Sequence, residues 1–286
     1  MKTFLLTGST GYLGSHLLDA MLKKYSCILL NRRSSKNREK IDKYLPYIKE
    51  YFIDECSFDD IFKNEEIHGV IHAATTYDNA NINTSSIIQS NLLLPITLLE
   101  AAEKSGVKNF YNIDTVLNNN LNRYSKSKSQ FRDYVEHIKP KMSITHIRLE
   151  HMYGPGDNNK FIPMLIDKMK RDAPIDLTRG VQELDFIYID DVVSGIMTIL
   201  DDNRMNVQEI SSVDLGSGST ITLKEFVEML KDKINSNSEL HFGSIPYRKH
   251  EKMKSKADTS YLQKLGWAPK FSINEGIKKM VVYYDE

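Results

Sequence analysis

The fold is decided by the stretch Thr7-Gly8-Ser9-Thr10-Gly11-Tyr12-Leu13-Gly14, which follows the apolar segment 3–6 and precedes the amphipathic pattern His16-Leu17-Leu18. A strand, a glycine-rich turn and a helix in this order predict the first βα unit of a dinucleotide-binding sheet. Gly8 permits the tight turn, Gly11 lets the backbone approach a pyrophosphate, and Gly14 lets the helix pack closely on the strand. The amides at the start of the helix would face the phosphates, so residues 8–14 are predicted to bind the cofactor.

Short apolar segments alternate with helical patterns through the first half of the chain. Strands are predicted at 3–6, 27–30, 51–53, 69–72, 109–113 and 143–147, and helices at 12–24, 36–47, 85–104 and 123–138. This alternation predicts an α/β fold with a doubly wound parallel sheet, a Rossmann fold.

The alternation of strand and helix patterns becomes less regular after the turn cluster Gly154-Pro155-Gly156-Asp157. Helices are predicted there at 161–171, 190–200, 223–234 and 273–283. We therefore predict a dinucleotide-binding domain at 1–160, to which residues 186–215 return. A smaller C-terminal substrate-binding region is predicted at 161–286.

Composition excludes several classes of protein. The 286 residues are 41% apolar, and 38 basic residues balance 38 acidic ones, so no global field would attract nucleic acid or an anionic membrane. Two cysteines make no disulfide framework, no apolar run approaches the length of about 18 residues that spans a bilayer, and the N-terminus reads as a strand rather than a signal peptide. We expect a soluble cytoplasmic protein with no nucleic-acid or membrane partner. No His, Cys and Asp cluster has metal-site spacing, so no metal is expected.

The end of the second predicted strand indicates which nicotinamide cofactor binds. NAD enzymes of this fold carry an acidic residue there for the ribose hydroxyls, but this chain has Asn31-Arg32-Arg33. An arginine at this turn can pair with the 2′-phosphate of NADP. The alternative is a solvated basic loop. The missing carboxylate favours NADP(H) over NAD(H).

The chemistry is predicted at Tyr124 and Lys128, which are four residues apart on a predicted helix and so share one face. A tyrosine titrates near 10, and a nearby ammonium favours the phenolate, so we expect the pKa of Tyr124 to be lowered. A tyrosine and a lysine four residues apart more often belong to an exposed helix face. Here the helix follows the fifth strand, whose carboxyl end carries Thr115, and this edge of the sheet is where the fold binds its ligands.

Together these motifs resemble the extended short-chain dehydrogenase/reductases, specifically the group of nucleotide-sugar epimerases, dehydratases and ketoreductases. The resemblance covers nearly the whole chain. It also rests on Asp54, His72-Ala73-Ala74, Asn91, Arg148-Leu149-Glu150-His151-Met152-Tyr153-Gly154-Pro155, Asp185-Phe186-Ile187-Tyr188-Ile189-Asp190-Asp191 and Leu265-Gly266-Trp267-Ala268-Pro269.

The resemblance implies a role for each matching residue. Asp54 would bind the adenine end of the cofactor, Ala73, Ala74 and Asn91 would line it, and Thr115 would hydrogen-bond the sugar 4-oxygen beside Tyr124. Leu184 stands where the family usually has an arginine for the pyrophosphate, so Arg179 or Arg248 would have to compensate. The residues expected to bind substrate are Thr75, Glu150, His151, Phe161, Arg179 and Arg248. A homodimer is also expected.

Departures from the family pattern narrow the expected activity. Sugar 4,6-dehydratases carry an acidic pair directly after the position of Thr115, and this chain has Val116 and Leu117 there, which disfavours dehydration. The segment from Arg148 to Pro163 looks most like 4-ketoreductases of the CDP-abequose/CDP-paratose synthase type. The expected function is therefore NADPH-dependent reduction of the 4-keto group of a nucleotide-linked deoxyhexose, in surface-polysaccharide (lipopolysaccharide) sugar biosynthesis. An NAD-dependent nucleotide-sugar 4-epimerase and a non-catalytic NADP(H)-sensing protein remain as alternatives.

Overall fold

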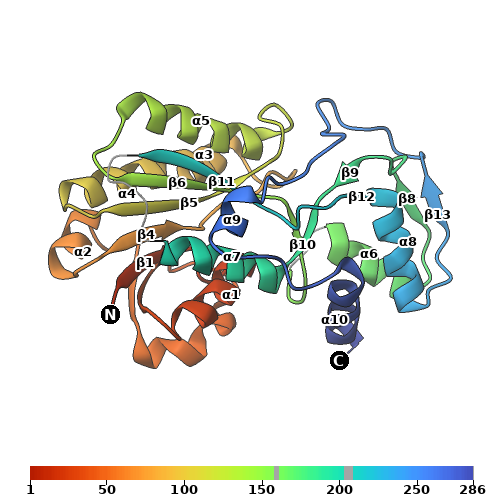
Figure 1. Cartoon of the computed structure of the whole chain (residues 1–286), viewed down its shortest axis with the longest axis horizontal. Helices are drawn as coiled ribbons and strands as arrows, with labels where there is room; N and C mark the ends of the chain where they lie inside the picture. Colours follow the sequence, from red (N-terminus) through yellow and green to blue (C-terminus); the bar gives the residue numbers. More distant parts are fainter. Residues whose placement is uncertain (158–160, 203–208, 286) are drawn as a thin grey trace. The chain divides into compact units, whose positions relative to one another are not determined.

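The computed structural model describes residues 1–157, 161–202 and 209–285. Residues 158–160 of the segment from Arg148 to Pro163 therefore lie outside the described residues. Two compact units make up the chain (Figure 1). The first comprises Met1–Arg148 and Leu200–Val213, and the second comprises Leu149–Ile199 and Asp214–Glu286. The first boundary falls at 148 where the sequence suggested 160, and the returning segment is 200–213, inside the expected 186–215.

The first unit is built on a seven-stranded sheet in the order β11-β6-β5-β4-β1-β2-β3. The neighbours β3 and β2, β2 and β1, β1 and β4, and β4 and β5 pair in parallel. The strands are β1 Thr3–Thr7, β2 Ser26–Asn31, β3 Lys49–Phe52, β4 Gly69–His72, β5 Asn109–Thr115, β6 Ser143–Leu149 and β11 Ile210–Leu215. The predicted doubly wound parallel sheet is thereby confirmed.

Helices cover the sheet, and most lie where the sequence predicts them. They are α1 Tyr12–Met21, α2 Phe58–Asn64, α3 Thr84–Ile88, the π-helical turn η3 Gln89–Leu93, α4 Leu94–Lys104 and α5 Arg123–Ile138. The prediction of one helix at 36–47 is wrong. Two 3-10 helices occupy it, η1 Arg38–Lys40 and η2 Asp42–Tyr47, and Pro46 within η2 has no amide hydrogen for an α-helical bond. The seven residues of α2 were not predicted.

The core explains why the central strands read as unbroken apolar runs. Leu5, Leu29, Val70, Ile71 and Phe110 are all fully buried, as expected for a parallel sheet covered on both faces. Apolar side chains fill both covered faces of the sheet, so polar side chains are found mainly where the strands end. The carboxyl ends of β1, β2, β4 and β5 therefore carry the polar groups that build the site.

The second unit contains short paired strands and helices. Its strands are β7 His151–Tyr153, β8 Ile175–Leu177, β9 Glu183–Leu184, β10 Phe186–Tyr188, β12 Ile221–Thr222 and β13 Leu240–Phe242, paired as β10 with β7, β12 with β9 and β13 with β8. Its helices are α6 Phe161–Lys170, α8 Leu223–Ile234, α9 Ser260–Lys264 and α10 Ile273–Asp285, while α7 Ile189–Asp201 contains the boundary between the units. The rings of Phe186 and Phe226 stack at its core with centroids 4.1 Å apart.

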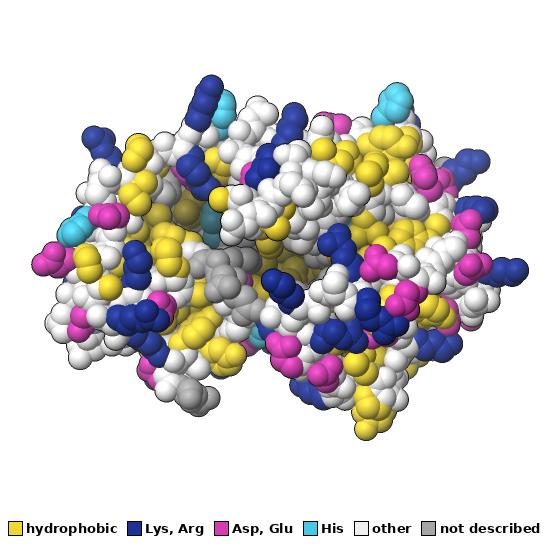
Figure 2. Space-filling model, turned by 180° about the vertical axis from the view of Figure 1, so that it is seen from behind, with side chains coloured by type: hydrophobic (Ala, Val, Ile, Leu, Met, Phe, Trp, Pro, Cys, Tyr) yellow, Lys and Arg dark blue, Asp and Glu magenta, His cyan; other side chains and the backbone are white. Residues whose placement is uncertain are grey.

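The surface agrees with the balanced charge. Figure 2 shows basic and acidic side chains interspersed on the face that it draws. Within the described ranges, no helix combines the length and the apolar composition that a bilayer span requires.

Candidate active site

The glycine turn between β1 and α1 is closely packed. Gly8 has a φ of +73°, and a Cβ there would lie 2.6 Å from the backbone nitrogen of Ala74. A Cβ on Gly14 would lie 2.1 Å from the carbonyl oxygen of Gly8. The roles expected of these two glycines, a tight turn and close packing of the helix, are therefore seen in the structure.

The start of α1 fits a phosphate group. Gly11 is its N-cap, and this fully described helix has neither a side-chain cap nor an acidic residue in its first turn. The amides of the first turn thus keep their capacity to bind an anion, and the helix dipole favours negative charge there. A dinucleotide pyrophosphate fits this position by charge and by the absence of competing side chains.

Asn31, at the end of β2, links the strand to the glycine turn. It is buried, its side-chain oxygen accepts a hydrogen bond from Ser9 Oγ at 3.0 Å, and its Nδ2 donates to Glu50 Oε1 at 2.8 Å. The sequence at the end of β2 did not predict a carboxylate beside Asn31, because Glu50 comes from the neighbouring strand β3. Arg38 forks both oxygens of Glu50 at 2.9 and 2.7 Å and balances its charge.

The two arginines after Asn31 have different surroundings. Arg33 forks both carboxylate oxygens of Glu55 at 2.7 and 2.6 Å and lies over the ring of Phe52 at 3.7 Å. Arg32 donates from Nη2 to Ser90 Oγ at 3.2 Å, and no ion pair joins it to a carboxylate of the described residues. Of the two, Arg32 keeps an unshared positive charge. Asp54, expected near adenine, is exposed in the turn after β3.

Asn91 clamps the loop that follows β4. Its Oδ1 accepts from the Thr76 amide at 2.8 Å and from Thr75 Oγ1 at 3.1 Å, while its Nδ2 donates to the Thr76 carbonyl and to Ser127 Oγ. The Thr75 hydroxyl, expected to contact substrate, is thus engaged inside the protein. Ala73 and Ala74 start the same loop, half-buried, next to the glycine turn.

Helix α5 presents Tyr124 and Lys128, and its start is held firmly. Asn122 and Ser125 form a reciprocal capping box. The Arg123 amide donates to Asp78 at 2.8 Å, and the Arg123 guanidinium binds the same carboxylate at 2.5 Å. Because Asp78 belongs to the loop after β4, this pair joins the loop to the first turn of α5.

Tyr124 is buried, and the Thr115 side chain lies close enough to its hydroxyl to act on its pKa, so the structure brings this predicted pair together. The predicted lowering of the Tyr124 pKa is wrong. Burial raises the pKa well above 10, and the neighbouring Tyr77 and Asp114 act in the same direction. The lowering was expected from the charge of Lys128, but desolvation of the buried phenolate is the largest effect on this pKa.

Lys128 is 2% exposed and donates from Nζ to the carbonyl oxygen of Ile113 at 2.8 Å. Burial lowers its pKa to about 8, against the opposing effect of Asp114. Asp114 is itself fully buried and pairs with Arg132 at 2.5 Å. This ion pair was not predicted, because Asp114 on β5 and Arg132 on α5 meet only in the folded chain.

The substrate residues expected in the second unit have varied surroundings. Glu150 is buried and accepts from Ser255 Oγ at 2.7 Å on both of its oxygens, so its carboxylate is already engaged. His151 Nδ1 lies 3.3 Å from Glu150. Arg248 is exposed and forks Glu251 at 2.8 and 3.0 Å. Arg179 is exposed, and Phe161 on α6 is 41% exposed.

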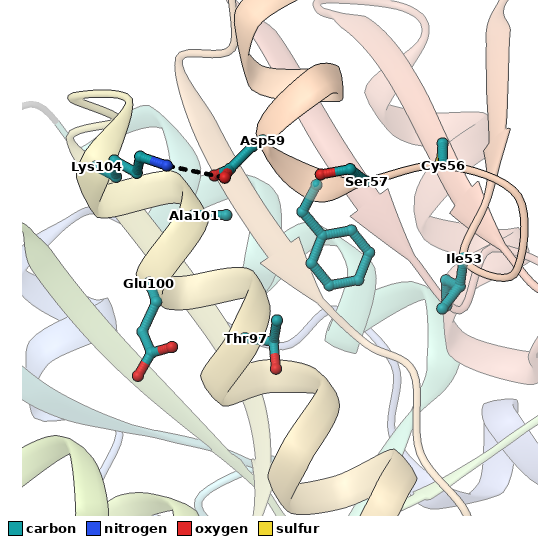
Figure 3. A pocket seen from close by; sticks show the side chains of 9 residues that line it. Ile53, Cys56, Ser57, Asp59, Thr97, Glu100, Ala101 and Lys104 are labelled. Carbon is teal, nitrogen blue, oxygen red and sulfur yellow. Dashed lines mark hydrogen bonds and ion pairs between the residues drawn. The ribbon is translucent and has the colours of Figure 1, made fainter.

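A separate cavity of about 480 Å³ lies between α2 and α4. Figure 3 shows the ion pair of Lys104 and Asp59 across it and Cys56 on its wall. Its lining contains none of the predicted site residues: Ile53, Cys56, Ser57, Phe58, Asp59, Thr97, Glu100, Ala101 and Lys104. Within the described part of the chain no group of His, Cys, Asp and Glu has the arrangement of a metal site.

A parallel sheet with this glycine turn and a buried Tyr124 beside Lys128 defines the class as a dinucleotide-dependent enzyme with a Rossmann fold. The chain belongs to the NAD dependent epimerase/dehydratase family, whose model matches residues 4–213. The predicted family and enzyme class are confirmed.

Relatives and solved structures match along almost the full length. CDP-abequose synthase of Salmonella muenchen is 36% identical, with 98% of this chain and 97% of that protein covered. The corresponding protein of Salmonella typhimurium is 32% identical, with 97% and 96% covered. The UDP-glucuronic acid 4-epimerase of Bacillus cereus, solved with UDP-glucuronic acid and NAD, superposes with a TM-score of 0.85 at 20% identity over 99% of each chain, a likeness of fold.

Proposed function

We propose that this protein uses NADPH to reduce the 4-keto group of a nucleotide-linked deoxyhexose. The observation that carries the proposal is the Tyr124 phenol, buried close to the Thr115 side chain, where burial holds its pKa well above 10. A phenol in that state keeps its proton at neutral pH and can donate it to an alkoxide that forms at C4. The full-length similarity to CDP-abequose synthases at 32 and 36% identity supports this substrate class.

The reaction needs a hydride, which bound NADPH would supply. Tyr124 donates the proton to the C4 oxygen, and the nearby Thr115 hydroxyl orients that oxygen. Lys128, whose ammonium is held by the carbonyl of Ile113, would supply a positive charge to the nicotinamide ribose when the cofactor is bound. The amides of the glycine turn bind the pyrophosphate.

The preference for NADPH rests on Arg32. Its guanidinium is the cation at the end of β2 that no carboxylate neutralises among the described residues, whereas Arg33 is neutralised by Glu55. A 2′-phosphate bound there would gain a charge-assisted hydrogen bond. Asn31 contributes by holding this turn against the glycine loop.

The remaining features follow from the same proposal. His151, Phe161, Arg179 and Arg248 of the second unit would contact the nucleotide of the substrate, with Glu150 as a support for this segment. The protein would act in the cytoplasm as a homodimer, in the synthesis of sugars for lipopolysaccharide.

A substrate screen tests the proposal. Purified protein is mixed with NADPH and a panel of CDP-, dTDP- and UDP-linked 4-keto-6-deoxy and 4-keto-3,6-dideoxy sugars, and the loss of nicotinamide absorbance is followed. Consumption of NADPH with one of these sugars supports the reductase. The corresponding 4-hydroxy sugars, incubated with the protein and NAD⁺, test the alternative: interconversion of their C4 epimers without net change in the nicotinamide would establish the epimerase instead. No reaction with any sugar of either panel would favour a sensor.

The first prediction concerns Tyr124→Phe, which keeps the buried ring and removes the proton. We expect kcat to fall by about 100- to 10,000-fold while NADPH affinity stays within about twofold, because the proton acts only in the chemical step. Steady-state rates and cofactor titration measure the two effects. Wild-type turnover by this variant would eliminate Tyr124 as the acid.

A further inference from the structure

Tyr77 lies against the proposed acid and has no role in the mechanism above. Its ring centroid is 4.9 Å from that of Tyr124, and the two ring planes are inclined by 38°. This separation is within the range of attractive aromatic contacts. Tyr124 is only 7% exposed, whereas Tyr77 is 43% exposed, so a large part of the second ring is accessible beside a buried reactive group.

The backbone on both sides of Tyr77 is anchored. On one side, Asn91 holds Thr76 through its amide and its carbonyl. On the other side, Asp78 binds the amide and the guanidinium of Arg123. These contacts fix the residues on either side of Tyr77, so the loop segment that carries its ring is held to Asn91 and to α5, as the wall of a binding site requires.

The position of the wall determines what it would meet. A sugar whose C4 oxygen accepts the Tyr124 proton must place its C4 next to that hydroxyl. The groups flanking C4 are C3 on one side and C5 with its C6 substituent on the other. Because the Tyr77 ring contacts Tyr124 and is partly exposed, we expect it to meet one of these two flanks.

We infer that Tyr77 is a specificity-determining residue, whose ring selects a sugar that lacks a hydroxyl on a flank of the reacting carbon. A hydroxyl pressed on an aromatic face loses its water partners without replacement, whereas a methylene or methyl group does not. This inference rests on the proposed function. It adds that the site prefers a substrate without a hydroxyl at C3 or at C6.

Kinetics in the oxidation direction test the inference, since alcohol sugars are chemically stable. Three CDP-hexoses with the C4 configuration of the enzyme's own product are compared as substrates, each with NADP⁺ as the oxidant. They are the 3,6-dideoxy sugar, its 3-hydroxy analogue and its 6-hydroxy analogue. Wild type should prefer the dideoxy sugar over at least one analogue by about 10- to 100-fold in kcat/KM, the discrimination that one group in an apolar pocket provides.

Three variants separate the role of the ring from other effects. Tyr77→Phe keeps the ring and should retain the preference, and Tyr77→Ala removes it and should reduce the preference to about threefold or less at the same analogue. Tyr47→Ala is the matched control, since Tyr47 is an 85% exposed tyrosine on η2, and it should leave the preference unchanged. Any general effect on Tyr124 cancels in the ratio, because every sugar depends on the same acid.

The outcomes distinguish this inference from the proposed function. Turnover by wild type with an unchanged preference in Tyr77→Ala would leave the reductase standing and overturn the role of Tyr77. A wild type that does not prefer the dideoxy sugar over either analogue would do the same. If the wild type oxidises none of the three sugars and reduces no 4-keto sugar, the proposed function is overturned, and the inference with it.

Discussion

At the residue scale, burial controls the protonation of the two central groups. It keeps Tyr124 as a neutral phenol, and it lowers the pKa of Lys128 to about 8, so the ammonium loses its proton only slightly above neutral pH. Asp114 opposes the loss of charge on Lys128, and Arg132 favours it. A proton donor beside a cation that persists at neutral pH suits the reductive direction of the reaction.

The pKa of Lys128 predicts how stability depends on pH. The folded pKa is about 8 and the ordinary value is 10.5, so between these values the unfolded chain binds more protons and the free energy of unfolding rises with pH. The full effect is about 3 kcal/mol. Urea unfolding of wild type and Lys128→Met from pH 7.5 to 10 should show wild type gaining stability relative to the variant. Parallel pH profiles would contradict the burial of a charged Lys128.

The environments of Arg32 and Arg33 predict unequal roles in cofactor choice. Arg32→Ala should weaken NADPH by about 10- to 100-fold, the value of one charge-assisted hydrogen bond of about 1.5 to 3 kcal/mol, and leave NADH nearly unchanged. Arg33→Ala should change the NADPH to NADH ratio much less, because Glu55 already pairs with Arg33. Fluorescence titration of both cofactors measures the ratios. Equal weakening of NADPH and NADH in Arg32→Ala would show that Arg32 does not contact the 2′-phosphate.

At the element scale, the position of α5 depends on contacts with the loop after β4 as well as on its own capping box. Asn91 contributes from the π-helical turn η3, where it binds both the loop and Ser127 of α5. Asp78 contributes through Arg123. The cofactor contact that the resemblance suggested for Asn91 stays a prediction, and its hydrogen bonds also make it a link between two elements that carry the site.

Replacing these two links should have unequal effects on stability. Asn91 is 1% exposed, and Asn91→Leu removes hydrogen bonds from buried groups that cost about 1 to 3 kcal/mol each when unsatisfied, so a loss of about 2 to 4 kcal/mol is expected. Arg123→Ala is the comparison, because its side chain is 39% exposed and a pair of this kind contributes at most about 1 kcal/mol. Chemical unfolding measures both values. A smaller loss for Asn91→Leu than for Arg123→Ala would refute this ranking.

At the scale of the whole molecule, the residues proposed for cofactor and for substrate belong largely to different units. The cofactor residues, from Gly8 to Lys128, all lie in the first unit, while five of the six substrate residues, all but Thr75, lie in the second. Binding of the two ligands should therefore be separable along the chain.

Hydrogen exchange with ligands should show this separation. Saturating NADPH should slow amide exchange at 8–14, 31–35 and 73–76 and raise the free energy of unfolding by about 2.7 kcal/mol at a hundredfold excess over Kd. Adding a CDP-sugar should extend protection to 149–155 and the segment around Arg248. Protection of the second unit by NADPH alone, equal to that of the first, would contradict this division of roles.

The sequence by itself determined the fold class, the family, the glycine turn and the place of Thr115 at the end of the strand that precedes the helix of Tyr124. Each depends on local order along the chain: apolar runs that can only be buried strands, glycines at fixed offsets, and a helix that follows β5. Such features need no knowledge of distant neighbours. The sequence also located α5 correctly, because its apolar periodicity and its cap are contained within one segment.

Only the tertiary structure decided the protonation of Tyr124, the pairing of Asp114 with Arg132, the neutralisation of Arg33 by Glu55 and the contact of Tyr77 with the acid. Each joins residues that are not neighbours on one element. Their energies depend on burial and on distances below about 5 Å, which the order of residues along the chain does not contain. The charge of Lys128 was visible in the sequence, but the desolvation that raises the pKa of Tyr124 appears only when the chain is folded.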